Sequence, residues 1–161
     1  MVWISRYLIA SIYFYDLGDE LSNVCTVLVQ VISSAVAFNQ LRALQLTQKI
    51  VPVMSTESVL LGNLVDVATN RLSGNEKTQK AAQSLLETIV AECDKVTLLP
   101  LFSNRAMKNA TGRAFLLTAI VDMSRHLQDK RPNYVVKYVD HYNCDNFASF
   151  MWYYPVRMLH I

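Results

Sequence analysis

Few side chains in this sequence have the type and spacing needed for chemistry. His141 and Cys144 are three residues apart, so a helix would place an imidazole and a thiol on one face, where both could bind zinc. Zinc needs about four ligands, however, and no second close pair of ligand residues occurs. Cys93 and His126 are distant in sequence. A buried cysteine beside a surface histidine is therefore the preferred interpretation.

Nucleophilic and acid–base catalysis lack their usual sequence signatures. A reactive cysteine must be exposed beside a base, whereas Cys25 and Cys93 lie among apolar residues typical of a buried helix face. The chain has no Gly-x-Ser-x-Gly elbow, no phosphate-binding loop and no dinucleotide fingerprint. Glu87 and Asp122 are single carboxylates without a close acidic partner. We expect no enzyme, no cofactor and no metal.

Composition favours a helical, cytoplasmic protein. The 161 residues suffice for one domain or a piece of a longer helical array, and 52% apolar residues can build a sizeable core. Only 4 Gly and 4 Pro favour long helices with short links. The 3 cysteines are odd in number and far apart, so we interpret them as thiols in a reducing compartment.

The charge is unevenly distributed along the chain. The net charge of +2 is too small to indicate nucleic-acid binding. Residues 71–137, however, hold 11 Lys and Arg against 6 Asp and Glu, whereas residues 1–40 hold Arg6 against three acids. The second half of the chain is therefore predicted to contact an acidic partner, and we expect that partner to be a protein.

The first residues are apolar. Val2–Tyr15 contains Arg6 and is shorter than the roughly 20 residues that cross a bilayer. It lacks a basic leader and a clear small-residue cleavage site. We interpret it as a buried first helix and expect no membrane association, with a signal peptide or anchor as the alternative.

Apolar residues recur every three or four positions along most of the chain, which predicts helices. Ser22 and Asn23 are expected to cap the second helix, Thr78 to cap the fifth, and Pro52 to end or kink the third. The expected core stripe of the second helix is Val24, Val27, Leu28, Val31 and Ile32. The predicted helices are 3–15, 24–37, 41–54, 58–72, 78–93, 96–107 and 113–127, followed by 134–142.

A polar turn followed by a basic residue and a small residue occurs three times, near Ala43, Ala82 and Ala114. The steps of 39 and 32 residues are typical of stacked helix pairs. We expect turns within pairs at 38–40, 73–77 and 108–112, and links between pairs at 55–57, 94–95 and 128–133. The expected layout is a leading apolar helix (1–18), helical repeats (19–142) and an irregular aromatic segment (143–161).

This pattern resembles the HEAT repeat, most closely over residues 64–72 and 85–89. The stretches 98–101 and 107–113 are similar to TOG domains of the CLASP and crescerin type. The resemblance covers roughly residues 19–142. It implies an all-α fold, a right-handed α–α superhelix of stacked hairpins. It also implies a non-catalytic module that binds tubulin or microtubules along the edge made by its within-pair turns. The expected location is the cytoplasm, at the cytoskeleton or cilium.

Five residues are predicted to face the partner when the resemblance is carried over to the turns of this chain: Asn75, Lys77, Lys108, Asn109 and Arg113. A row of basic residues would attract an acidic surface such as that of tubulin. The alternative is that these are ordinary solvated turn residues. The chain would then be a scaffold segment of a larger HEAT or armadillo-like transport or phosphatase-type assembly, without tubulin contact.

Overall fold

The described part of the chain consists of helices and their connections, without a strand. The computed structural model describes residues 18–34, 36–54, 58–108, 110, 112–128, 130–131 and 133–135. Their elements are α2 (Gly18–Ser33), α3 (Ala37–Ile50), the 3₁₀ helix η1 (Val51–Val53), α4 (Ser58–Arg71), α5 (Glu76–Glu92), α6 (Lys95–Lys108) and α7 (Arg113–Gln128). The expected all-α class is confirmed over these ranges. The leading segment 1–17, the helix expected at 134–142 beyond Val135, and the aromatic segment 143–161 lie outside them.

Apolar stripes at helical spacing form the core, as the sequence predicts. All members of the stripes on α4 and α5 are at most 1% exposed: Leu61, Leu64, Val65 and Ala68 on α4, and Ala82, Leu85, Leu86 and Ile89 on α5. Burying each Leu, Ile or Val side chain of these stripes stabilises the fold by about 1.5–3 kcal/mol before the cost of ordering the chain. The amphipathic pattern therefore selects both the helices and the faces that they turn inward.

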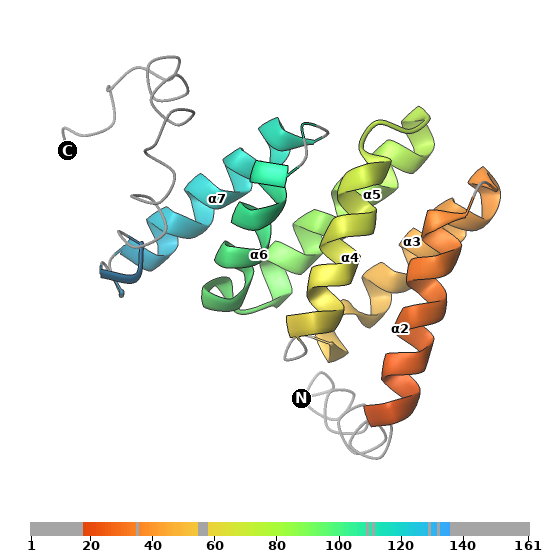
Figure 1. Cartoon of the computed structure of the whole chain (residues 1–161), viewed down its shortest axis with the longest axis horizontal. Helices are drawn as coiled ribbons and strands as arrows, with labels where there is room; N and C mark the ends of the chain where they lie inside the picture. Colours follow the sequence, from red (N-terminus) through yellow and green to blue (C-terminus); the bar gives the residue numbers. More distant parts are fainter. Residues whose placement is uncertain are drawn as a thin grey trace, which may run out of the picture.

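Consecutive helices pack in pairs, and the pairs pack side by side. α2 contacts α3, α4 contacts α5, and α6 contacts α7. Between pairs, α2 contacts α4 and α4 contacts α6, while α3 packs against α5 (Figure 1). The helices thus lie in two layers, and the core fills the space between α2, α4 and α6 on one side and α3 and α5 on the other.

Polar side chains also join neighbouring pairs. Gln48 of α3 donates from Nε2 to Ser84 Oγ (3.0 Å) and Thr88 Oγ1 (2.9 Å) of α5. Arg105 of α6 forms an ion pair with Asp66 of α4, with Nη1 3.2 Å from Oδ1. Nη2 of the same guanidinium donates to the Asp66 backbone carbonyl (3.1 Å). These directional contacts fix how the second pair lies on each neighbour.

The first turn lies four residues earlier than predicted. The expected turn at 38–40 is wrong, because these residues form the first turn of α3, and the connection between the helices lies between Ser33 and Ala37. Gln40 is buried, and its Nε2 donates to the carbonyl oxygen of Ser34, just after α2. Its amide thus satisfies an orphan carbonyl at the end of a helix rather than facing solvent in a turn.

Two predicted caps are also wrong. Ser22 and Asn23 lie inside α2, which already includes Gly18 and Asp19, so they do not cap it. Thr78 is buried in the first turn of α5, and Asn75 is the cap: its Oδ1 accepts from the Thr78 backbone N–H at 3.0 Å. Asn is a strong N-cap residue because its short side chain reaches this orphan donor.

Two prolines lie among the described residues, one after a helix and one inside a helix. α3 ends at Ile50, and Pro52 lies in the 3₁₀ turn that follows, which confirms the predicted helix end. Pro100 lies within α6, in its second turn, where it cannot donate to the Val96 carbonyl; this carbonyl accepts from the Tyr134 hydroxyl at 2.6 Å instead. Because Pro has no N–H to donate, it costs least near the start of a helix.

Candidate protein-binding edge

The three turns within helix pairs lie along one edge of the molecule. Figure 1 shows the α2–α3, α4–α5 and α6–α7 turns along the top, with the links between pairs at the opposite edge. Gly112, in the α6–α7 turn, has a φ of 69° and contacts the end of α4. A Cβ placed there would clash with Leu72 Cδ1 and lie 3.2 Å from Thr69 Cγ2. The second and third turns are therefore close neighbours.

Lys77 and Lys108 are exposed at this edge. Lys77 lies in the first turn of α5, and Lys108 is the last residue of α6. Neither has an ion-pair partner among the described residues. Both ammonium groups are free to interact with an acidic surface.

Arg113 has a structural contact as well as an exposed charge. It is the first residue of α7, and its Nε donates to the Ala106 carbonyl oxygen at 2.9 Å. This bond satisfies one of the orphan carbonyls at the end of α6. Arg113 remains exposed, so its positive charge adds to that of the two lysines at the edge.

The other predicted binding residues are placed differently. Asn75 is at the edge, but its side-chain oxygen is occupied as the N-cap of α5. Asn109 lies outside the described residues. Lys80 pairs with Glu76, with Nζ 2.7 Å from Oε1 and both side chains largely exposed. The excess positive charge of this edge therefore resides on Lys77, Lys108 and Arg113.

The described cysteines are packed in the interior. Cys25 and Cys93 are 1% and 3% exposed. Burial raises the pKa of the Cys25 thiol. Burial and then the negative charge of Glu92 raise the pKa of Cys93 to about 11, with Lys95 opposing the shift. Thiols that stay protonated and covered are poor nucleophiles and poor metal ligands.

The raised pKa of Cys93 predicts a loss of stability at high pH. Below about pH 9 the Cys93 thiol keeps its proton in both the folded and the unfolded protein. Between pH 9 and 11 only the unfolded chain releases this proton. The free energy of unfolding should therefore fall by about 2–3 kcal/mol across this interval. Urea unfolding at a series of pH values, in wild type and Cys93→Ala, measures the difference. Equal pH slopes in both proteins would contradict the prediction.

Within the described residues, no group of three or more His, Cys, Asp or Glu side chains is placed to hold a metal ion. The candidate pair His141 and Cys144 lies outside these residues. No helix in the described ranges is both long enough and apolar enough to cross a bilayer. No protein-family model, curated protein or solved structure matches the chain.

Proposed function

We propose that this chain is a non-catalytic protein-binding module whose helix pairs stack as the hairpins of HEAT repeats do. Its binding surface is the edge formed by the within-pair turns, and its partner presents an acidic surface. The observation that carries the proposal is the placement of Lys77, Lys108 and Arg113, exposed and at the ends of three helices along this edge.

Several features of the edge suit binding of a large, acidic surface. The turns form a row rather than a pocket, so a flat or convex partner can contact several of them at once (Figure 1). The N-terminus of α5 is closed by Asn75 and does not need a ligand. Lysines without internal partners can pair with carboxylates of a partner and increase the rate of association.

Tubulin is the partner that we propose. It is acidic, and the resemblance of this chain to TOG domains implies contact through the same kind of turn. The module would then act in the cytoplasm at microtubules and contribute to their organisation. Binding through exposed charge should weaken as salt rises, because screening shortens the range of the interaction.

Reversing the two lysine charges is expected to abolish most of the binding. Lys77→Glu combined with Lys108→Glu should lower the amount of protein that co-pellets with microtubules at low salt, with an affinity reduced by about tenfold or more. The circular dichroism spectrum and melting temperature should change little, because both side chains are exposed.

A matched control reverses two charges away from the edge. Lys130 and Arg131 are exposed and follow α7 at its opposite end. Lys130→Glu combined with Arg131→Glu should co-pellet like wild type. Equal pelleting of all three proteins at low salt, or equal losses in both double variants, would contradict the role of this edge.

A further inference from the structure

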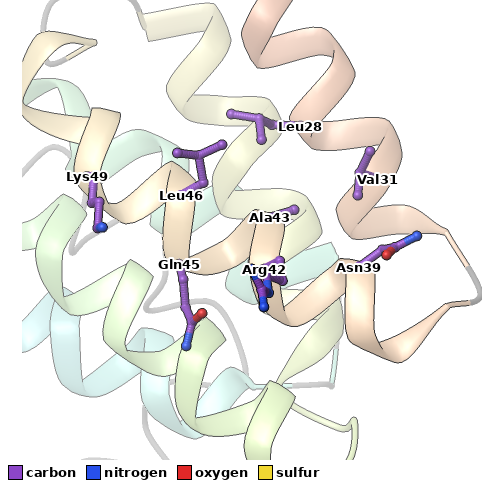
Figure 2. A pocket seen from close by; sticks show the side chains of 8 residues that line it. All are labelled: Leu28, Val31, Asn39, Arg42, Ala43, Gln45, Leu46 and Lys49. Carbon is purple, nitrogen blue, oxygen red and sulfur yellow. The ribbon is translucent and has the colours of Figure 1, made fainter.

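A second surface, distinct from the turn edge, lies on the first helix pair. A groove of about 600 Å³ runs between α2 and α3. Figure 2 shows Leu28 and Val31 of α2 on one side, and Ala43, Leu46 and Arg42 of α3 on the other. The groove is thus built from two helix faces with an apolar floor.

The apolar surface extends beyond the groove itself. The predicted core stripe of α2 is only partly buried: Leu28 and Ile32 are covered, but Val24 and Val27 are 44% and 56% exposed. The expectation that both valines lie in the core is therefore wrong. Leu46 of α3, which lines the groove, is 49% exposed. Contiguous apolar surface of this kind marks a site of interaction.

The charged side chains that line the groove are both positive. Arg42 and Lys49 are seven residues apart on α3, which places them two turns and about 10 Å apart on the same side of the helix. The guanidinium carbon of Arg42 lies 5.0 Å from the centre of the Phe38 ring, a cation–π contact that restrains the side chain. Among the residues that the structure describes, no acidic side chain lines the groove.

We propose that this groove binds an amphipathic α-helix of another protein, with an apolar stripe and acidic residues beside it. The stripe would lie on Val31 and Leu46, over a floor to which the nearly covered Leu28 contributes. Two acidic residues seven positions apart would repeat at the same spacing as Arg42 and Lys49 and pair with them. Helices that bind in grooves use anchor residues at positions i, i+3 or i+4, and i+7. The span from i to i+7 equals the two helical turns that separate Arg42 from Lys49.

Charge argues against two occupants from this chain itself. The apolar segment Trp3–Tyr15 contains Arg6 and no Asp or Glu, so it could not pair with Arg42 and Lys49. A second copy using the same groove would bring the two pairs of cations together, because a two-fold interface places the same patch on both sides. An amphipathic acidic helix from a different protein would both cover the apolar floor and pair with the two cations.

Designed peptides test the proposal on the full chain. One 18-residue helical peptide carries Leu at positions i, i+4, i+7 and i+11 with Glu on both flanks, and a second carries Lys in place of Glu. By fluorescence anisotropy at low salt, the Glu peptide should bind at least about tenfold more tightly than the Lys peptide. Arg42→Glu combined with Lys49→Glu should reverse this preference, a result that a general loss of folding could not produce.

Control variants separate the groove from other surfaces. Leu46→Glu should weaken binding of the Glu peptide. Val59→Glu on α4 should not, because Val59 is more exposed than Leu46 but lies outside the groove. The variant with Lys77→Glu and Lys108→Glu should bind the peptide like wild type, since the proposal is independent of the turn edge. Equal binding of both peptides, or of neither, would overturn it. So would a dimer in sedimentation that Leu46→Glu converts to monomer, because the occupant would then be a second copy.

Discussion

Phe102→Ala is expected to lower the free energy of unfolding by about 3–5 kcal/mol. Phe102 is fully buried in α6, and no larger side chain is completely covered among the described residues. Removing the ring takes away its transfer free energy and leaves a cavity that helices packed on both sides of α6 cannot fill. A loss of this size is a large part of the 5–15 kcal/mol typical of a folded domain.

Urea unfolding followed by circular dichroism measures this change. Met107→Ala is the matched control, because Met107 lies on the same helix and is 50% exposed. Its cost should stay below about 1 kcal/mol. Phe102→Leu leaves a smaller cavity and should cost about 1–2 kcal/mol, which keeps the test informative if the alanine variant does not fold. Equal costs for Phe102→Ala and Met107→Ala would contradict the packing described for α6.

Gly112→Ala is expected to destabilise the protein by about 2–4 kcal/mol. Two costs contribute. The φ of 69° is left-handed, which costs a residue with a side chain about 1–2 kcal/mol. The new methyl group would also displace Leu72 Cδ1, the far end of a flexible side chain, and crowd Thr69, which adds about 1–2 kcal/mol of overpacking.

A double-mutant cycle separates these two costs. Leu72→Ala removes the clashing Cδ1 atom but leaves the backbone conformation unchanged. In that background Gly112→Ala should cost the conformational part, about 1–2 kcal/mol, and the smaller contribution of the Thr69 contact, which Leu72→Ala leaves in place. The same cost in both backgrounds would show that Leu72 does not limit the space at Gly112. The cycle therefore also tests whether the second and third turns are in contact.

Stripes on α4 and α5 could be predicted residue by residue. Leu61, Leu64 and Val65, and then Leu85 and Leu86, follow the helical period without interruption and are all buried. Their helices are covered on several sides by neighbouring helices, so nearly every apolar position on the stripe finds a partner. Under these conditions the pattern alone determines both the element and its inward face.

The first helix pair could not be predicted in the same way. Asn39 and Gln40 have the polar character of a turn, but Gln40 is buried because its amide bonds to the end of the preceding helix. Val24 and Val27 have the spacing of a core stripe, yet the described residues leave them exposed. A single sequence shows that a residue is apolar or polar, whereas burial depends on which segment lies against it.

The candidate binding edge was partly predictable. Lys77, Lys108 and Arg113 follow from the positions of the turns, which Gly112 and the ends of the apolar stripes indicate. The role of Asn75 as a cap required the observed start of α5. The groove was missed because its floor combines residues from two helices. The one signal available in the sequence was the spacing of Arg42 and Lys49, which lie seven residues apart on the same predicted helix.

The contact of Arg105 with Asp66 has a consequence for any partner of the edge. The Arg105 side chain is only 13% exposed and bonds to both the carboxylate and the backbone of α4. Apolar surfaces can slide over one another at little cost, but directional bonds cannot lengthen without breaking. The position of α6 along α4 is therefore restrained, so a ligand of this edge would meet helix ends whose spacing is set before binding.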